Sequence, residues 1–564
     1  MTVLQITPKP EPPGPEPAEA GRGCCTGGAV CGCSPERLED QGPAAAVEVG
    51  GELRTSSYII YVDLPDNDSD MLIVHGYTGA FDKVSRRIAT FLRAKEDRRA
   101  PRPLYGDWTP SPVTESAADL PEHYLQVLLQ RGYLTYLSRE QELERFRRLA
   151  DEMHAQAQSP SYVLMPTYDC NLRCFYCFQD HMRTNPSFSY LLKRMTHPMV
   201  DRIFDAMPNI EANHGISQED GYRRPVTLFG GEPLLRANRD LIEHILRRAK
   251  RGGTDSCSVV TNGTDLDAYA DLLGPAGGSG GSASRARTAG LAALQITIDG
   301  IPSEHDQRRI YSDGQGSFDR IARNITLALD RDATVSVRLN IDRNNIGQLP
   351  ALAQIFVDHG WDERSRFRAY ATVLVATNDK TDRRTTFSSW ELDQELAQLQ
   401  ADYPVMTVIE PKDSDIRRRA RSVFGGAHAS MQTTFCSAHS GMYVIDRFGD
   451  MYACWERTGN SKTRIGRINE DSSVEVNEPF ASMWRGRSVT SNPVCRQCRY
   501  ALYCGGGCAV HAEGRKGTLD ANYCDGYAFR FRAMVAEAYS EYLSGAITGD
   551  LRQHDDASIA MMNL

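Results

Sequence analysis

Apolar runs and amphipathic segments alternate between residues 161 and 375. The short runs are rich in β-branched and aromatic residues, which favours strands, whereas 239–250 and 316–330 have the apolar spacing of helices. The expected strands are SYVLMP, PVTLFGG, SCSVVTNG, ALQITIDG, TVSVRLNID and FRAYATVLV. Strands that alternate with crossover helices form parallel sheets, so the pattern predicts an α/β fold, a partial (β/α)6 TIM-like barrel. Chemistry in such a fold belongs at the carboxyl ends of the strands.

Residues 58–137 have a different pattern. YIIYVDL and MLIVHGY indicate two strands, 80–96 has helical spacing, and PEHYLQVLLQRGYLTYL indicates a helix that ends at Gly132 and a short strand. These elements predict a winged-helix-like domain. It is either a structural cap or a module that binds a peptide by adding a strand to an exposed sheet edge.

Two segments lack any such periodicity. Residues 1–52 are rich in Pro, Gly, Ala and Glu and are expected to be a disordered tail. Four cysteines lie in it, and their spacing matches no common metal site: Cys24, Cys25, Cys31 and Cys33. Residues 274–290, GPAGGSGGSASRARTAG, are expected to form a flexible surface insertion.

The charge of the chain argues against two kinds of partner. The 64 basic and 73 acidic residues give a net charge of −9, without the basic footprint of a protein that binds nucleic acid or an anionic membrane. The start has no signal peptide, and no apolar run approaches the roughly 18 residues of a membrane span. We therefore expect a cytoplasmic protein. In that compartment thiols stay reduced, so the 15 cysteines indicate metal binding or catalysis.

CNLRCFYCF follows the first expected strand directly and holds Cys170, Cys174 and Cys177 at C-x3-C-x2-C. A structural zinc site normally has four protein ligands, and no fourth cysteine is near. In a [4Fe–4S] cluster, three thiolates leave one iron without a protein ligand. That open iron is a place where chemistry can occur.

CNLRCFYCF resembles the signature of radical S-adenosylmethionine (radical SAM) enzymes, and LFGGEPLL, ITIDG and EHDQRRI resemble further motifs of that family in the same order. The resemblance implies that the open iron is chelated by the amino and carboxylate groups of S-adenosylmethionine. It implies that Tyr176 packs against the adenine of the cofactor and that the Thr297 hydroxyl contacts the cofactor. It also implies that Arg309 reaches the carboxylate of the cofactor. The amino group of the cofactor would be contacted by Gly230, Gly231 and Glu232.

Seven cysteines near the C-terminus resemble the SPASM extension of radical SAM enzymes that modify peptides and proteins. By that resemblance, one auxiliary [4Fe–4S] cluster is bound by Cys495, Cys498, Cys504 and Cys524, and another by Cys436, Cys454 and Cys508. The second set has three thiolates, so its remaining iron is open to substrate, bound by His439 or bound by a ligand that the sequence does not reveal. The alternative is a zinc ribbon, although zinc tetrahedra would use four or eight cysteines. Cys257 is expected to be a buried small apolar residue.

These patterns predict six segments: a disordered tail (1–52), the winged-helix-like domain (53–150), the radical SAM core (155–375), a linker (376–430), the SPASM domain (431–545) and a second tail (546–564).

The resemblance implies an oxidoreductase-type enzyme with three [4Fe–4S] clusters. It would abstract a hydrogen atom from a residue of a ribosomally made precursor peptide to install a crosslink or related modification, with a flavodoxin- or ferredoxin-type reductant. One alternative is an anaerobic sulfatase maturase or another protein-maturing radical enzyme. In sulfatase maturases an aspartate follows the second SPASM cysteine, whereas this chain has Trp455 there and then Glu456. The other alternative is a zinc-stabilised, non-catalytic peptide-binding protein.

Overall fold

The computed structural model describes residues 51–65, 67–96, 120–217, 221–276, 288–411 and 414–545. Both predicted tails, except residues 51 and 52, and most of the predicted insertion lie outside the described residues, as do Cys24, Cys25, Cys31 and Cys33.

The chain divides into two compact units that are each discontinuous in sequence. Unit 1 comprises Met1–Ala155, Asp413–Phe435 and Ser488–Gln553. Unit 2 comprises Gln156–Lys412, Cys436–Arg487 and His554–Leu564. The predicted SPASM segment, 431–545, is therefore divided between the two units.

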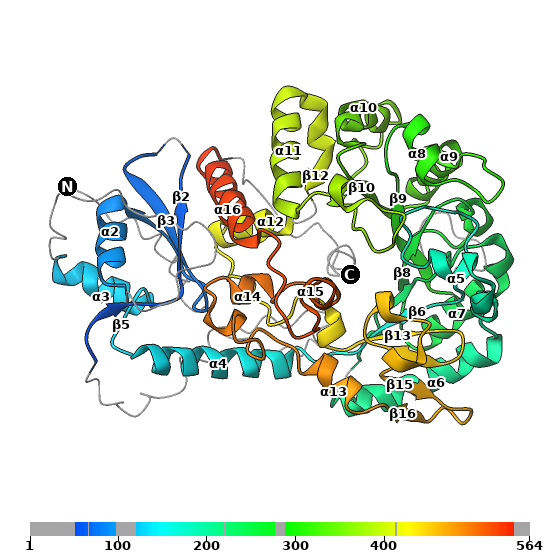
Figure 1. Cartoon of the computed structure of the whole chain (residues 1–564), viewed down its shortest axis with the longest axis horizontal. Coiled ribbons are helices and arrows are strands. Elements are labelled where there is room, and N and C mark those ends of the chain that lie inside the picture. Colours follow the sequence, from blue (N-terminus) through cyan, green and yellow to red (C-terminus); the bar gives the residue numbers. More distant parts are fainter. Residues whose placement is uncertain are drawn as a thin grey trace, which may run out of the picture. The chain divides into compact units, whose positions relative to one another are not determined.

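Unit 2 is built on an eleven-stranded sheet, and its first six strands in chain order run parallel to one another (Figure 1). They are β6 (Ser161–Leu164), β7 (Val226–Leu228), β8 (Ser256–Thr261), β9 (Gly290–Thr297), β10 (Thr334–Ile341) and β11 (Phe367–Val373). Each strand pairs with the next along the chain, and each lies within one of the predicted apolar runs or overlaps it. The parallel α/β sheet predicted from the sequence is confirmed.

Strands that the sequence pattern does not reveal extend this sheet at both ends. β12 (Ile409–Pro411) pairs with β11, and β13 (Met442–Ile445) pairs in parallel with β6. β14 (Asp450–Tyr452), β15 (Gly466–Ile468) and β16 (Val474–Val476) continue from β13 as an antiparallel meander. The segment that begins at Cys436 thus continues the sheet that carries the Cys170 loop.

Helices follow the parallel strands in unit 2. Their bounds are α5 (Asp180–Thr184), α6 (His197–Asn213), α7 (Arg239–Arg251), α8 (Pro302–Arg308), α9 (Phe318–Leu329), α10 (Leu349–Asp358), α11 (Ser389–Asp402) and α13 (Phe480–Arg485). Both helices predicted from apolar spacing form, as α7 and α9. No helix in the described parts of the chain is both long and apolar enough to cross a membrane.

A three-stranded antiparallel sheet is the centre of unit 1, with β2 (Ile59–Asp63), β3 (Asp70–His75) and β4 (Phe81–Ser85) in that order. Alternate side chains of β2 and β3 point to opposite faces, and both faces are buried. Ile59 and Tyr61 belong to one apolar cluster, with residues of α2, whereas Ile60 and Val62 belong to another, with residues of α16.

The other elements of unit 1 come from both ends of the chain. They are β1 (Arg54–Thr55), α2 (Arg86–Ala94), α3 (Glu122–Gln130), β5 (Leu134–Thr135), α4 (Arg139–Gln156), α12 (Ser414–Phe424), α14 (Ala501–Cys504), α15 (Ala509–Lys516) and α16 (Tyr527–Leu543). The predicted helix and short strand around Gly132 form as α3 and β5. The helix predicted over 80–96 is wrong in its first part, because 81–85 pair with β3 as a strand and α2 begins after its N-cap Ser85.

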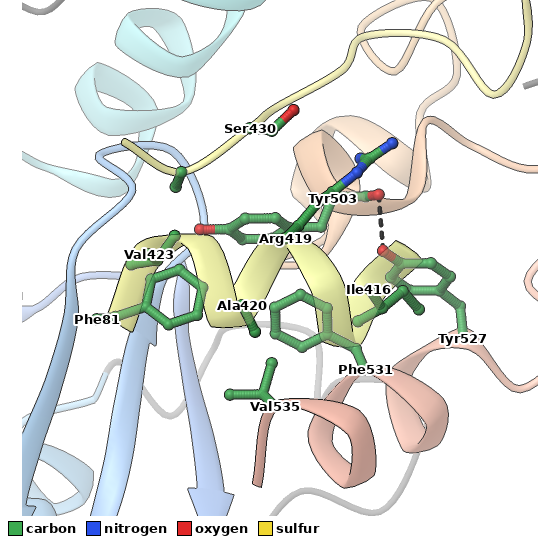
Figure 2. A pocket seen from close by; sticks show the side chains of 11 residues that line it. Phe81, Ile416, Arg419, Ala420, Val423, Ser430, Tyr503, Tyr527, Phe531 and Val535 are labelled. Atoms are coloured by element: carbon green, nitrogen blue, oxygen red, sulfur yellow. Dashed lines mark hydrogen bonds between the residues drawn. The ribbon is translucent and has the colours of Figure 1, made fainter. Parts of the chain in front are cut away.

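The N-terminal and C-terminal segments share one core in unit 1. Tyr58 and Phe146 stack with ring centroids 4.8 Å apart and lie in the same apolar cluster as Cys495 and Leu502. In addition, Phe81 of β4 lines an apolar pocket with residues of α12, α14 and α16, where the Tyr527 hydroxyl donates to the Tyr503 carbonyl (Figure 2). Residues 53–150 have one apolar cluster of their own and share two others with the C-terminal segment, and the winged-helix-like assignment stays a prediction.

A buried carboxylate ties α4 to the strands of unit 1. Glu142 accepts hydrogen bonds from Arg54 Nη2 (2.8 Å), Ser56 Oγ (2.5 Å) and the Ser57 amide (3.1 Å). Burial acts to raise the pKa of Glu142, but Arg54 and these donors hold it below its ordinary value.

Replacing Glu142 with alanine should destabilise unit 1 by about 3 kcal/mol, because it leaves the charge of Arg54 without its carboxylate and takes the acceptor from Ser56 Oγ and the Ser57 amide. Hydrogen exchange of the β2 amides measures this loss. Glu144→Ala, on the exposed side of the same helix, should leave exchange unchanged. Equal exchange rates in the two variants would contradict the role given to Glu142.

Candidate active site

The loop that follows β6 carries Cys170, Cys174 and Cys177 at the carboxyl end of a parallel strand. It is tightly wound, since the Cys177 amide donates to the Cys174 carbonyl (3.1 Å) and the Asp180 amide to the Cys177 carbonyl (3.1 Å). Burial of the sulfur raises the pKa of Cys170 to about 12 and that of Cys174 to about 11. Metal ligands bind as thiolates, so binding at these cysteines would release protons.

Two side chains that sequence reasoning missed donate to these sulfurs. Arg183 Nη2 lies 3.1 Å from Cys177 Sγ, and Asn262 Nδ2 lies 3.7 Å from Cys170 Sγ. Asn262 also donates to Asn171 Oδ1 (2.8 Å). Asn262 follows β8, so the ends of the first and third parallel strands meet at this site.

The glycine pair after β7 packs against the backbone that leads into the cysteine loop. The Gly231 amide donates to the Thr167 carbonyl (3.0 Å). A Cβ on Gly230 would lie 2.4 Å from the Thr167 carbonyl oxygen, and one on Gly231 would lie 2.2 Å from that of Asp169. Both positions therefore require glycine because two main chains approach closely, and the pair positions the cysteine loop.

Glu232 is buried and its carboxylate is bound within the chain. It accepts hydrogen bonds from Thr261 Oγ1 (2.6 Å), the Asn262 amide (2.6 Å) and the Leu234 amide (2.8 Å). Burial raises the pKa of Glu232 to about 7. In this arrangement Glu232 holds the Asn262 loop in place, and its contact with the amino group of a ligand stays a prediction.

Tyr176 and Arg309 belong to one polar network. Arg309 Nη1 donates to the Tyr176 hydroxyl (2.8 Å), which in turn donates to Asp299. The Asn340 amide and Nδ2 donate to Asp299 Oδ1, at 3.1 Å each. The network joins the cysteine loop to the ends of β9 and β10. Thr297 is the last residue of β9 and is paired in register with Arg338 of β10.

Several buried donors of this region have no acceptor among the described residues: Gln179 Nε2, Arg183 Nε, Arg183 Nη1 and Arg309 Nε. A buried donor without a partner costs about 1–3 kcal/mol, and more when it is charged. An anionic group with several acceptor atoms would satisfy them. Three thiols beside two partly unsatisfied guanidinium groups therefore suit an iron–sulfur cluster with a carboxylate-bearing ligand.

The loop that follows β11 also contacts the cysteine loop. Asn378 Nδ2 donates to the carbonyls of Phe175 (2.9 Å) and Cys177 (3.1 Å), on either side of Tyr176. Lys380 Nζ pairs with Asp180 Oδ2 at 2.5 Å. The first and sixth parallel strands are thereby connected through their carboxyl-end loops.

Asn378→Asp should loosen the cysteine loop, because it removes both Nδ2 donors and places a negative charge beside two carbonyls. We expect hydrogen exchange at residues 175–178 of the metal-free chain to accelerate about tenfold, as expected for the loss of two hydrogen bonds. Asp379→Asn, at the exposed neighbouring position, is the control and should not change exchange. Equal exchange in Asn378→Asp and wild type would show that the loop does not depend on this contact.

The predicted auxiliary cysteines lie in both units. In unit 1 the pKa of Cys504 is raised by burial and then by the thiols of Cys498, Cys495 and Cys524, so these four predicted ligands lie close together. Of the other predicted set, Cys436 and Cys454 belong to unit 2 and Cys508 to unit 1, and this cluster stays a prediction. Within the described ranges, no group of three or more His, Cys, Asp or Glu side chains is arranged around a single metal-ion position.

The structure gives His439 partners within the protein, and its role as a cluster ligand stays a prediction. His439 is buried, its Nδ1 donates to the Trp484 carbonyl (2.8 Å), and its Nε2 lies 3.4 Å from Arg487 Nη1. Both ring nitrogens thus have partners. Cys257 is buried on β8, as predicted.

Comparison with known proteins assigns the central part of the chain to a superfamily. Residues 164–353 match the Radical SAM superfamily. A cysteine-type anaerobic sulfatase-maturating enzyme of Clostridium novyi (strain NT) is 22% identical over 396 residues, which are 67% of this chain and 96% of the relative. A GTP 3′,8-cyclase of Caulobacter vibrioides is 27% identical over 195 residues, which are 34% of this chain and 47% of the relative.

Solved structures support the same fold. The structure of histidine-tagged anSMEcpe with bound AdoMet (S-adenosylmethionine) has a TM-score of 0.51 and 16% identity, over 72% of this chain and 98% of that one. At this identity the likeness concerns the fold alone. The superfamily match covers the Cys170 loop and every strand from β7 to β10. The family implies a [4Fe–4S] cluster and S-adenosylmethionine as cofactors, and residues 164–353 of this chain form a domain of the radical SAM superfamily.

Proposed function

We propose that this protein is an oxidoreductase-type radical SAM enzyme that abstracts a hydrogen atom from a residue of a ribosomally made precursor peptide and so installs a crosslink or a related modification. The observation that carries the proposal is the loop of Cys170, Cys174 and Cys177 at the carboxyl end of β6, beside buried donors that lack an acceptor.

The bound cofactors supply a 5′-deoxyadenosyl radical, and the protein supplies position and shielding from water. Cys170, Cys174 and Cys177 would hold three irons and leave the fourth to S-adenosylmethionine. The Arg309–Tyr176–Asp299 network would fix the aromatic ring beside the adenine and aim a guanidinium at the ligand's carboxylate. The auxiliary cysteines would hold clusters that accept an electron from the oxidised substrate, and a flavodoxin- or ferredoxin-type protein would supply the first electron.

A peptide or protein substrate is supported by two features. The Clostridium novyi relative is, by its name, an enzyme that matures another protein. In addition, β4 is one of the two terminal strands of the three-stranded sheet in unit 1, where an extended peptide could pair with it.

Sulfatase maturation is the second candidate function, favoured by the same relative. Trp455 occupies the position of the aspartate in those enzymes and stacks on Phe229, with ring centroids 5.0 Å apart and planes at 24°. A stacked indole cannot take a proton from the substrate, which leaves Glu456 as the nearest carboxylate in sequence. We therefore prefer the precursor-peptide substrate.

The test is turnover by anaerobically reconstituted protein with S-adenosylmethionine and dithionite. Its probes are a synthetic peptide encoded by a short reading frame beside the gene and a sulfatase peptide with a target cysteine. The proposal expects 5′-deoxyadenosine and a precursor peptide that has lost the mass of two hydrogen atoms for each crosslink. Processing of the sulfatase peptide alone would favour the second candidate. A colourless protein that holds zinc would reject both in favour of a non-catalytic peptide-binding protein.

A further inference from the structure

Arg183 brings a positive charge to the cysteine loop. It lies in α5, six residues after Cys177, and its Nη2 donates to Cys177 Sγ at 3.1 Å. Its Nε and Nη1 are shielded from solvent and have no acceptor in the part of the chain that the structure describes. None of the ion pairs found within the described residues includes Arg183, although a shielded guanidinium requires a compensating anion.

No described side chain supplies the compensating anion, but the proposed function, on which this inference rests, supplies one. An oxidised [4Fe–4S] core carries two positive charges, so with three thiolates it has a net charge of −1, and reduction by one electron makes this −2. Its sulfurs are also hydrogen-bond acceptors. A cluster on Cys170, Cys174 and Cys177 thus offers Arg183 both the charge and the acceptors that the protein lacks.

We propose that Arg183 is a positioning residue that raises the reduction potential of this cluster, by donating to Cys177 Sγ and by keeping its charge beside the sulfurs. Hydrogen bonds to the sulfurs and nearby charge are among the factors that set cluster potentials. A positive charge favours the more negative, reduced state. The step it assists is the transfer of one electron from the flavodoxin- or ferredoxin-type reductant to the oxidised cluster.

Asn262 gives a comparison at the other side of the loop. Its amide approaches Cys170 Sγ at 3.7 Å, which is longer than the Arg183 contact, and it carries no charge. A charge that is shielded from water acts on the sulfurs more strongly than a neutral amide at a longer distance does. Of these two side chains, Arg183 is therefore the one whose removal should change the potential more.

The experiment is a redox titration followed by electron paramagnetic resonance, using the signal that changes when S-adenosylmethionine is added. Arg183→Met removes the charge and the donors but keeps the length, whereas Arg183→Lys keeps the charge. At a fixed applied potential we expect the ratio of reduced to oxidised cluster to fall about tenfold in Arg183→Met, which corresponds to about 59 mV for one electron. Arg183→Lys should keep this ratio close to that of the wild type. Arg194→Met, which removes an exposed charge elsewhere in unit 2, should leave the ratio unchanged.

Iron content is measured on every variant. If Arg183→Met binds too little iron, Arg183→Gln takes its place and the same tenfold fall is expected. An unchanged ratio in an iron-replete Met or Gln variant would overturn the inference while the proposed function stands. Absence of 5′-deoxyadenosine in the iron-replete wild type would instead overturn the proposed function.

Discussion

Replacing Cys170, Cys174 and Cys177 together with alanine should abolish 5′-deoxyadenosine formation and remove about a third of the roughly 12 irons expected for three clusters. These thiols are the predicted ligands of the cluster that cleaves S-adenosylmethionine, and they lie on one loop at the end of β6. Iron and acid-labile sulfide are measured after anaerobic reconstitution, and 5′-deoxyadenosine is measured after reduction with dithionite.

Cys257→Ala is the matched control, because Cys257 is also a free cysteine of unit 2 but is buried on strand β8. It should retain full iron content and full cofactor cleavage. Cleavage by the triple variant would show that the catalytic cluster is bound elsewhere. Loss of nearly all iron would show that the auxiliary clusters do not form independently of it.

Peptide binding should weaken about tenfold in Lys83→Pro if substrate adds a strand to β4. The Arg86 amide donates to the Ser69 carbonyl, and the His75 amide donates to the Ala80 carbonyl. These two contacts show which residue pairs of β3 and β4 are hydrogen-bonded, because such pairs alternate along an antiparallel ladder. The backbone groups of residues 82 and 84 therefore face β3, whereas the amide of Lys83 points to the outer edge. Proline removes that amide, and one lost hydrogen bond is worth about 1.5 kcal/mol at most, or about tenfold in affinity.

Lys83→Ala is the control, since it removes the same ion pair with Asp70 and keeps the amide. Binding of the labelled synthetic precursor peptide is measured by fluorescence anisotropy on the full chain. Tight binding by both variants would place the peptide elsewhere, whereas equal weakening in both would assign the effect to the lysine side chain. Deletion of residues 1–150 is a poor test, because Tyr58 and Phe146 share a core with Cys495 and Leu502.

The long strands of unit 2 and the cysteine loop could be predicted because both leave a continuous local pattern. A buried parallel strand is a run of apolar residues, and the three predicted ligands of one cluster lie within eight residues of the sequence. By contrast, β13 to β16 have only three or four residues each, which is too short for a period to be recognised. For Phe81 to Ser85, apolar residues three apart fitted a helix as well as a strand, and pairing with β3 decided between them.

The polar residues around the cysteine loop could not be found in the same way. Arg183, Asn262, Asp299, Asn340 and Asn378 are single side chains at the ends of different elements, and only the parallel sheet brings them to one edge. The glycines of GGEP were expected to approach a ligand, whereas the structure shows them against the backbone of Thr167 and Asp169. The sequence also gives no sign that residues 488–545 pack with the N-terminal segment, because that contact joins positions more than 300 residues apart.

The central claim is that S-adenosylmethionine binds the open iron of the cluster held by Cys170, Cys174 and Cys177. It is tested most directly by electron paramagnetic resonance of the dithionite-reduced protein with and without S-adenosylmethionine. We predict that the wild type has one signal whose g-values change on addition, and that this signal is missing from the triple alanine variant. A cluster-loaded wild type in which S-adenosylmethionine changes no signal, or a triple variant that keeps the responsive signal, would contradict the claim.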